Sequence, residues 1–296
     1  GNFTNTGIIS ANANATGSYA YAYGVDTGDI GSFTNSGTIL ANAKNTNATD
    51  GSAEAYGVDA WNIGNFINSG TISASAISNA TDRAASAEGV YAYDGIGNFT
   101  NTGTILANAK NANATNGNAG AYGVDADNFI VNFTNTGTIS ANANATNGDA
   151  YAYGVNAWDI GYFTNTGTIS ASANVTNGDA EAGGVKAYSI GNFINNRTIL
   201  VSANVTNGDA WAEGVYAGSN IGNFTNTGTI LANANATNGY AGAYGVPAYD
   251  VGNFTNTGTI SANANVTNGD ADAGGVGGYS IGNFINTGTI FILVSA

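Results

Sequence analysis

GNFTNTGTI, the stretch Gly222–Ile230, recurs with few changes ten times along the 296 residues of the chain. Neighbouring copies start 30, 33, 33, 34, 30, 30, 31, 30 and 30 residues apart. A fixed period of this length is typical of repeat architectures, in which each repeat forms one structural unit. We therefore expect one domain over 1–296, with repeats starting at Gly1, Gly31, Gly64, Gly97, Val131, Gly161, Gly191, Gly222 and Gly252 and a terminal half-repeat at 282–296.

Strict alternation of residue types within one repeat predicts β-strands. In the repeat 131–160, Phe133, Asn135, Ile139 and Ala141 share one parity, whereas Thr, Ser and Asn fill the positions between them. Alternation with a period of two places these sets on opposite faces of a strand. We expect the Phe, Ile and Ala face to point inward, together with Asn135, and the Thr, Ser and Asn face to point outward.

Asn-Gly and Gly corners divide each repeat into about three short strands. Asn147-Gly148 is a turn signal, and a second alternation then places Ala150 and Ala152 inward. One repeat cannot bury its inner face alone, so stacked repeats with parallel strands roughly 4.8 Å apart are required. The expected fold is all-β: a single parallel β-solenoid (β-helix) of about nine and a half coils, with roughly 30 residues per coil. Such a rod would be on the order of 45 Å long.

Three inner positions hold the same residue type in all ten copies: Phe, Asn two residues later, and Ile four residues after that. Stacked rings, amides and aliphatic side chains would form ladders along the core, with amides bonding from coil to coil. Because an unpaired buried amide is costly, the Asn column could alternatively hold a ligand. The ladders include Phe133, Asn135, Ile139, Phe163, Asn165, Ile169, Phe224, Asn226 and Ile230.

The composition restricts the chemistry that the chain can perform. Its net charge is −14, and its five basic residues are scattered, which excludes a nucleic-acid surface. The absence of Cys, Met and His removes disulfides, soft metal ligands and the commonest general base, so we predict no cofactor and no metal. We see no signal-peptide pattern and no apolar run of transmembrane length. We therefore expect a mature or trimmed segment without direct membrane insertion.

Repeated outward aromatic residues suggest a contact surface. Tyr151, Tyr153 and Trp211 are expected on one outer strand, and Trp158 and Tyr188 on the next. Repeated outward rings exceed what solubility requires, and they fit either self-association between rods or contact with carbohydrate or other cell-surface ligands. Ordinary packing between neighbouring strands explains them equally well.

The final half-repeat ends in IFILVSA where other repeats continue with ISANAN or similar polar sequences. The apolar residues of this tail are Phe291, Ile292, Leu293 and Val294. They could cover the open end of the stack or pair with a second copy, because exposed strand edges invite head-to-tail addition.

Each complete repeat also carries an Asn-Ala-Thr or Asn-Val-Thr acceptor pattern, which we expect at the same position in every coil, beside a predicted turn. An Asn- and Thr-rich repeat produces such patterns by chance, and sugars on every coil would crowd one another. Partial glycosylation and a purely structural origin both stay open. The positions are Asn14, Asn47, Asn79, Asn113, Asn144, Asn174, Asn204, Asn235 and Asn265.

Three site chemistries can be weighed against this scaffold. Carbohydrate-active enzymes on β-helices need clustered acids or bases, whereas here the acids are spread thinly and the bases do not cluster. Acids one coil apart, such as Asp149 and Asp179, could share calcium, but the G-G-x-G-x-D pattern is absent. Outward Thr rows such as Thr134, Thr136 and Thr138 could form an ice-binding array, although Thr also suits any exposed strand.

The string IGNFTNTGTILA at Ile96–Ala107, with Gly89-Val90 upstream, resembles the repeats in passenger regions of bacterial autotransporter and filamentous-haemagglutinin-like surface proteins. Comparable strings cover the whole chain. The resemblance implies a β-solenoid and a secreted, extracellular or cell-surface location. The near-identity of the repeats is closer to a fibre or a recently amplified array than to a typical adhesin.

The sequence therefore predicts a non-enzymatic extracellular structural protein. Its expected role is that of a self-associating subunit of a fibre or filament, with further copies of itself as partners in a head-to-tail homopolymer. One alternative is the stalk or binding region of a bacterial surface adhesin. A second alternative is an ice-binding protein that uses its outward Thr rows.

Overall fold

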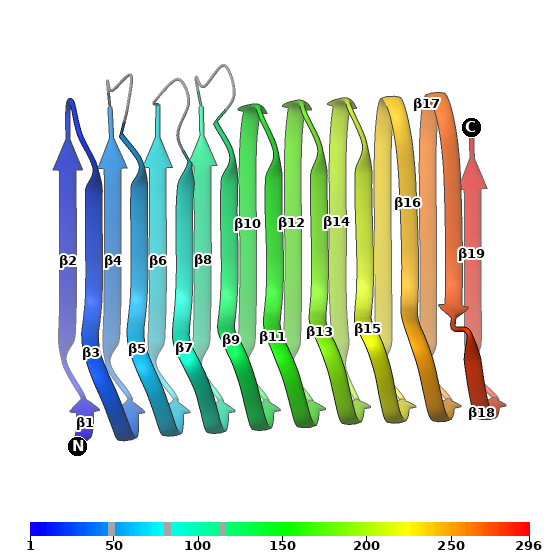
Figure 1. The fold of residues 1–296 in the computed structure, drawn as a ribbon, viewed down its shortest axis with the longest axis horizontal. Coiled ribbons are helices and arrows are strands. Elements are labelled where there is room, and N and C mark those ends of the chain that lie inside the picture. Colours follow the sequence, from blue (N-terminus) through cyan, green and yellow to red (C-terminus); the bar gives the residue numbers. More distant parts are fainter. Residues whose placement is uncertain (47–50, 80–83, 113–116) are drawn as a thin grey trace.

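The computed structural model describes residues 1–46, 51–79, 84–112 and 117–296, which form nineteen β-strands and no helix. Most strands alternate between a long and a short type (Figure 1). The long strands are β3 (Ala20–Asn35), β5 (Ala53–Asn68), β7 (Ala85–Asn101), β9 (Ala119–Asn135), β11 (Ala150–Asn165), β13 (Ala180–Asn195) and β15 (Ala210–Asn226). The short strands are β2 (Ile8–Ala15), β4 (Thr38–Asn45), β6 (Thr71–Ser78), β8 (Thr104–Asn111), β10 (Thr138–Asn147), β12 (Thr168–Asn177) and β14 (Thr198–Asn207).

Five further strands lie at the two ends of the chain: β1 (Asn2–Asn5), β16 (Thr229–Asn256), β17 (Thr259–Gly277), β18 (Ser280–Asn286) and β19 (Thr289–Ser295). Strands β16 and β17 each join a short and a long segment without a break.

The strands wind into one parallel β-solenoid of about nine turns, which confirms the predicted fold class (Figure 1). We number its coils 1 to 10 from the repeat starts given above. Each strand pairs in parallel with its equivalent one coil later, so that Phe163 in β11 pairs with Phe193 in β13. The N- and C-termini lie at opposite ends of the rod.

Each coil has three straight segments because the long strand bends. In β11 the pairing to β13 skips Gly154, Trp158 and Gly161. Figure 1 shows the long strands descending along the front of the rod and turning at its lower edge, with the short strands behind them. We call residues equivalent to 150–157 the front wall, those equivalent to 158–165 the lower edge, and those equivalent to 168–175 the back wall.

The Phe column forms the largest part of the core. Rings in neighbouring coils stack face to face from Phe3 to Phe284, with centroids 4.7–5.0 Å apart and planes within 6° of parallel. Phe133, Phe163 and Phe224 are fully buried within this stack. This spacing matches the distance between parallel strands, so one ring fills each level of the rod.

The inner Asn side chains form a continuous hydrogen-bonded ladder. Asn135 Nδ2 donates to Asn165 Oδ1 at 2.9 Å, and Asn165 Nδ2 donates to Asn195 Oδ1 at 2.9 Å. Asn226 continues the pattern by donating to Asn256 at 2.8 Å. These amides are buried, and the bonds within the ladder offset the cost of removing them from water. The described contacts therefore give these amides a structural role.

A glycine column allows the Ile column to pack against the front wall. A Cβ atom at Gly154 would lie 2.4 Å from Ile169 Cγ2 and 2.6 Å from the carbonyl oxygen of Gly184. Such approaches are too close for any side chain, so the Gly-Val step of each repeat is a packing requirement. Ile139, Ile169 and Ile230 are fully buried as a result.

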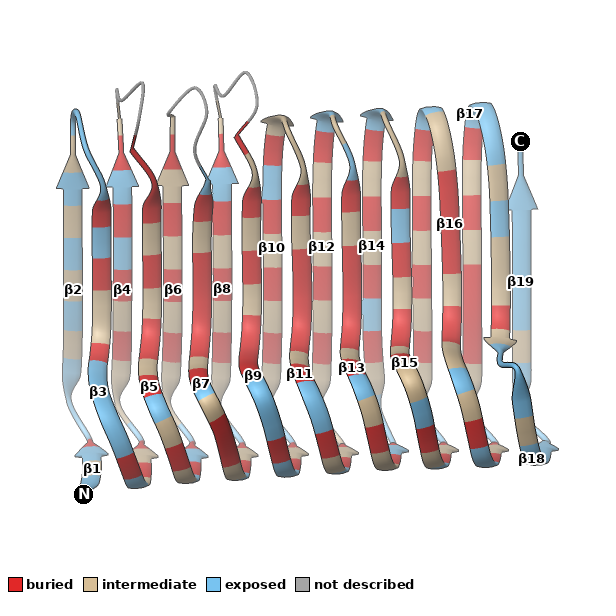
Figure 2. Cartoon of the chain, viewed as in Figure 1, coloured by how far each residue is buried: buried red, intermediate tan, exposed pale blue. Residues whose placement is uncertain are grey.

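Small side chains fill the remaining space between the walls. Ala150 and Ala152 on the front wall and Ala141 and Ala143 on the back wall are all fully buried. Figure 2 shows this alternation of buried and less buried residues on every central coil, and the greater exposure of β18 and β19. Equivalent positions are therefore buried in successive central coils, whereas the residues of the last coil are mostly exposed.

Candidate functional site

Unlike the core, the outer side of the front wall varies from coil to coil. In register with Tyr153, the neighbouring coils carry Tyr122 and Gly183. Three outer columns show this variation. They consist of Tyr21, Glu54, Ser86, Gly120, Tyr151, Glu181 and Trp211; Tyr23, Tyr56, Glu88, Tyr122, Tyr153, Gly183 and Glu213; and Asp26, Asp59, Tyr91, Asp125, Asn156, Lys186 and Tyr216.

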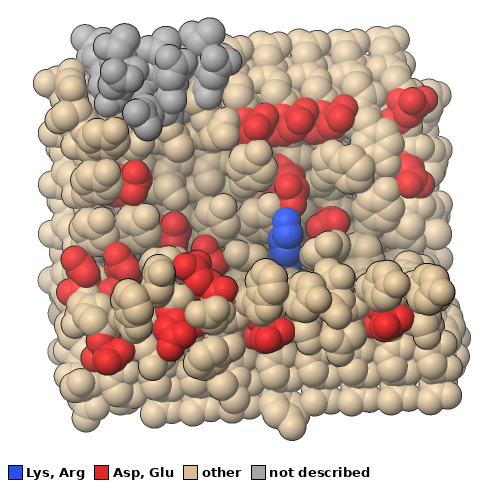
Figure 3. Space-filling model, viewed as in Figure 1, with Lys and Arg blue, Asp and Glu red and all other residues tan. Residues whose placement is uncertain are grey.

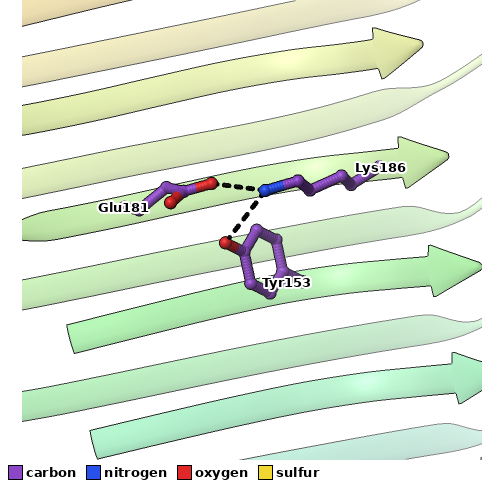
Figure 4. A network of polar contacts seen from close by, with 3 residues as sticks. All are labelled: Tyr153, Glu181 and Lys186. Carbon is purple, nitrogen blue, oxygen red and sulfur yellow. Dashed lines mark hydrogen bonds and ion pairs between the residues drawn. The ribbon is translucent and has the colours of Figure 1, made fainter. Parts of the chain in front are cut away.

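A polar network surrounds Lys186 at the centre of this wall (Figure 4). Lys186 Nζ donates to Glu181 Oε1 at 2.5 Å and to Tyr153 Oη at 3.2 Å, and it lies 4.6 Å from the centroid of the Tyr153 ring. Burial raises the pKa of the nearby Glu213 carboxyl to about 7, although the Lys186 ammonium opposes this rise. The single ammonium group of Lys186 therefore favours the charged form of two carboxyl groups, those of Glu181 and Glu213.

Tyr153 differs from the expectation that it contributes to an exposed contact surface. Its exposed fraction is 6%. It lies on the outer side of the wall, but its ring covers Gly183, where a Cβ atom would come within 2.9 Å of Tyr153 Cδ1. Lys186 lies over the same ring. Alternation alone predicts the correct side of the strand for Tyr153. It does not predict that the long side chain of Lys186, in the next coil, covers the ring.

A second group of acids lies in the N-terminal half of the same wall. Glu88 is buried, burial raises the pKa of its carboxyl well above the ordinary value, and its Oε2 atom has no hydrogen-bond partner among the described residues. Burial also raises the pKa of Asp125 to about 6, opposed by a hydrogen bond from Asn156. Figure 3 shows acidic side chains gathered over this part of the front face. The Asp125 carboxyl therefore takes up a proton in mildly acidic solution.

Asp149, Asp179 and Asp209 form a straight acidic row farther along the rod. The backbone N–H of Asp179 donates to Asp149 Oδ1 at 3.0 Å, and that of Asp209 donates to Asp179 Oδ1 at 2.9 Å. Within the described ranges, no three acidic side chains are grouped in a way that could hold a metal ion. The row thus serves in coil-to-coil hydrogen bonding at this corner.

Exposed aromatic rings line the lower edge of the front as stacked pairs. Trp61 stacks on Tyr93 with centroids 4.3 Å apart, and Trp158 stacks on Tyr188 at 4.8 Å. On the front wall above them, Tyr151 is half-buried and Trp211 is exposed. Tyr151 Oη donates to Asp149 Oδ2 at 3.1 Å, and burial raises the pKa of Tyr151 to about 12. The stacked pairs therefore place exposed aromatic surface along the lower edge.

Most acceptor-pattern asparagines form a second, outer amide ladder. Asn174 Nδ2 donates to Asn144 Oδ1 at 3.1 Å and to Ser172 Oγ at 3.2 Å, so both of its N–H groups are engaged. The ladder continues through Asn204, Asn235 and Asn265, with bonds of 2.8–2.9 Å. These residues line an open groove of about 700 Å³. Attaching a sugar to Nδ2 would remove one N–H from this ladder.

The longer coils do not place their acceptor patterns at this level. In register with Asn14 and Asn144 lie Lys44, Ile77 and Lys110. Asn79 lies beyond the end of β6, two residues past that register. Asn47 and Asn113 fall outside the described residues. The expectation of one shared position in every coil is therefore wrong, because coils 2 to 4 gain residues after this register.

The Thr triplets do not lie on one straight strand. Thr134 belongs to β9 and Thr138 to β10, whereas Thr136 lies in the bend between them. Arg197 also replaces the glycine of this bend in coil 7 and lines a hollow of about 370 Å³ beside Thr136 and Thr138. Ice binding through a flat hydroxyl array is not supported by this geometry.

The last coil presents apolar side chains to solvent. Phe291, Ile292, Leu293 and Val294 in β19 have exposed fractions of 42–50%. Strand β19 pairs with β17 on one side, with Phe291 in register with Ser261 and Leu293 in register with Asn263. Among the described residues, no helix is long and apolar enough to cross a membrane.

Comparisons with protein-family models, with curated proteins and with solved structures yield no match to this chain. The structure by itself defines a parallel β-solenoid built from tandem repeats. Sequence reasoning missed the network of Lys186, Glu181, Tyr153 and Glu213. The available signal was Lys186 itself, which is the only basic residue between Lys110 and Arg197.

Proposed function

We propose that this chain is a non-enzymatic structural rod that associates with further copies of itself into a fibre. Two features support the proposal. The Phe and Asn ladders extend into coil 10, where Phe284 stacks on Phe254 and Asn286 accepts a bond from Asn256. Strand β19 then presents apolar residues beside an open edge, which is the kind of edge that pairs with another chain.

The observation that carries the proposal is the change of residue type on the outer face of β19. Phe291 and Leu293 occupy outward positions that coil 9 fills with Ser261 and Asn263. A polar outer face would keep this end of the rod soluble. Apolar residues there favour contact with a second molecule, because covering them removes apolar surface from water.

The charge of the chain sets conditions for such assembly. With a net charge of −14, two rods repel each other at low ionic strength. Salt screens this repulsion over about 10 Å at 0.1 M. We therefore expect assembly to increase with salt and with mild acidity, since burial raises the pKa of Asp125 to about 6 and that of Glu213 to about 7.

Restoring the residues of coil 9 tests this proposal. The double variant Phe291→Ser with Leu293→Asn should lose filaments, detected by sedimentation velocity, while its far-ultraviolet circular dichroism stays unchanged. The matched control is Leu200→Ser, which replaces an exposed Leu in the middle of the rod with the residue that coil 6 has at Ser170. Deleting residues 291–296 should act like the double variant. Unchanged filaments in either end variant would rule out contact through β19.

A role as the stalk or binding region of a bacterial surface adhesin is the second candidate. The exposed aromatic pairs of the lower edge favour it, because they form a surface that the core does not require. The resemblance of the repeats to autotransporter and filamentous-haemagglutinin-like passenger regions fits both roles. It also supports our proposal of a secreted, extracellular or cell-surface location.

A further inference from the structure

The polar network around Lys186 has a counterpart in coils 1 to 3 of the same wall. Two carboxyl groups and two tyrosine rings surround Lys186, and the same residue types recur at the equivalent positions of the earlier coils. The matching pairs are Glu181 and Glu54, Glu213 and Glu88, Tyr153 and Tyr23, and Tyr216 and Tyr91. At the position of Lys186 itself, coil 2 carries Asp59. The counterpart therefore keeps the surroundings of the ammonium group but has a carboxyl group in place of the lysine.

The Lys186 network shows which chemical group occupies this arrangement (Figure 4). Lys186 Nζ bonds to Glu181 and Tyr153, and it lies 4.6 Å from the centroid of the Tyr153 ring and 5.8 Å from that of Tyr216. An ammonium group offers three N–H donors to oxygen acceptors, and the faces of tyrosine rings attract its charge. The cation that balances two carboxyl groups at these positions is thus an alkylammonium group.

The counterpart has no such cation among the described residues. In coils 1 to 4 the described basic side chains are Lys44 and Lys110, and both belong to back-wall strands, β4 and β8. Arg83 lies outside the described residues. Figure 3 shows acidic side chains, and no basic ones, over the described part of the N-terminal half of the front face. We call Glu54, Asp59 and Glu88 the coil-2 acid cluster.

Glu88 is the member of the cluster that most needs a partner. Its exposed fraction is 8%, and its Oε2 atom has no hydrogen-bond partner among the described residues. Burial, followed by the charges of Asp125 and Asp59, raises the pKa of Glu88 well above its ordinary value. At the equivalent Glu213, the Lys186 ammonium opposes the effect of burial. A buried carboxyl oxygen without a donor is costly, and an added ammonium group would supply that donor.

Tyr56 determines where a cation would lie in the cluster. It stands at the position of Gly183, and its ring stacks on Tyr23 with centroids 5.1 Å apart, so the ring face equivalent to the one that the ammonium group covers is already occupied. Tyr56 Oη donates to Glu54 Oε2 at 3.5 Å. Burial and the charges of all three cluster carboxyl groups raise the pKa of Tyr56. The three carboxyl groups therefore surround the Tyr56 hydroxyl, and the cation position lies beside that hydroxyl.

The spacing of the carboxyl groups favours an ammonium group over a metal ion. In the part of the chain that the structure describes, no three acidic side chains are grouped in a way that could hold a metal. Calcium requires its oxygen ligands at about 2.3–2.6 Å from one point. An ammonium group instead donates separate bonds of about 2.7–3.2 Å in three directions, so its acceptors can be farther apart.

Further acids along the wall extend the site beyond one ammonium group. Asp26 lies one coil before Asp59 in the same column, roughly 4.8 Å away at the usual strand spacing, and it is exposed. Asp127 in coil 4 is exposed as well. The net charge of −14 attracts cations in general. An amine with a second ammonium group can therefore contact one of these acids and should bind more tightly than a monoamine.

We propose that the coil-2 acid cluster binds the ammonium group of a small primary amine, with Glu54, Asp59 and Glu88 as its acceptors. The inference is independent of assembly through β19, because the cluster lies on the front wall of coils 2 and 3, whereas β19 lies on the back wall of coil 10. Filament formation and amine binding can therefore succeed or fail separately.

Isothermal titration of the parent chain with n-butylamine, putrescine and spermidine at low salt tests the proposal. All three should bind, the two polyamines more tightly, whereas n-butanol, which has the same stem without the charge, should not. Asp59→Lys gives coil 2 the residue that coil 6 carries at this position, so it should supply the cation internally. This variant should lose amine binding and gain thermal stability. Glu88→Gln keeps the shape of the side chain and should raise the Kd about tenfold or more.

The matched control is Asp159→Asn, which removes one carboxylate from an exposed position in coil 5. This variant should bind amines like the parent, and an equal loss of affinity in it and in Glu88→Gln would mean diffuse attraction to the whole chain. Amine binding that is absent from the parent, or unchanged in folded Asp59→Lys, would also overturn the proposal. If amines do not bind but Asp59→Lys abolishes self-association in sedimentation, the cluster holds a lysine of a second copy and the proposal is wrong.

Discussion

The inner columns and the outer front wall follow opposite rules, although they belong to the same strands. Inside, Phe163 stacks between two identical rings, and Asn165 bonds to two identical amides. Outside, Tyr153 has Tyr122 on one side and Gly183 on the other. The difference shows where the fold is determined. An inner residue must match the level above and below, whereas an outer residue is free to change.

The outer wall is consequently the place where individual coils differ in chemistry. Lys186 and Glu181 lie in coil 6, and Glu213 lies in coil 7, the next coil along the rod. Repetition of the core keeps the rod straight (Figure 1), and variation of the front wall gives each level its own surface. Two pairs of substitutions test this comparison at matched inner and outer positions, and a third pair tests protonation of the outer wall.

The largest effect is expected at the Phe column. Phe163→Ala should lower the free energy of unfolding by about 3–5 kcal/mol, because a buried ring is lost and its two stacked neighbours face a cavity. Tyr162→Ala, at the adjacent exposed position, should change it by roughly 0.5 kcal/mol or less. Denaturation by guanidinium chloride measures both. Similar losses for the two variants would contradict the division between inner and outer positions.

A somewhat smaller effect is expected at the amide ladders. Asn165→Leu removes the acceptor of Asn135 and the donor to Asn195, both of which are buried, so a loss of about 2–4 kcal/mol is expected. Asn174→Leu interrupts the outer ladder, where water can replace the lost partners, and should cost less than about 1 kcal/mol. The same denaturation experiment applies. An equal cost at both ladders would show that burial does not set their strength.

The smallest effect concerns protonation of the outer wall. Because folding raises the pKa of Glu213 from 4.5 to about 7, the folded chain holds more protons than the unfolded chain between these pH values. Stability should therefore fall as the pH rises through this window. Glu213→Gln should remove this part of the pH dependence and stabilise the chain at pH 8 by about 1–3 kcal/mol.

Thermal unfolding followed from pH 4.5 to pH 8 measures this effect. Asp159→Asn, which neutralises an exposed carboxyl at the lower edge of the same side of the rod, serves as the control and should keep the slope of the parent. A parent whose stability rises with pH across the window would show that Glu213 is not held in its protonated form.

The sequence predicts the core of this molecule better than its surface, for a physical reason. Phe133, Asn135 and Ile139 recur at a fixed period, so their inward position and their stacking follow from alternation and repetition. The burial of Tyr153 depends on Gly183 and Lys186, which belong to the next coil. The sequence of the repeat that contains Tyr153 therefore does not predict it. The register of Asn79 likewise depends on where coil 3 gains residues. Contacts between unlike coils require the structure.

Cryo-electron microscopy of the parent chain over a range of concentrations tests the central claim most directly. We predict filaments one rod in width, which lengthen with concentration and have a repeat of about 4.8 Å along their axis, because the parallel strands continue from one molecule to the next. Separate rods on the order of 45 Å long at every concentration would contradict self-association through the coil edges.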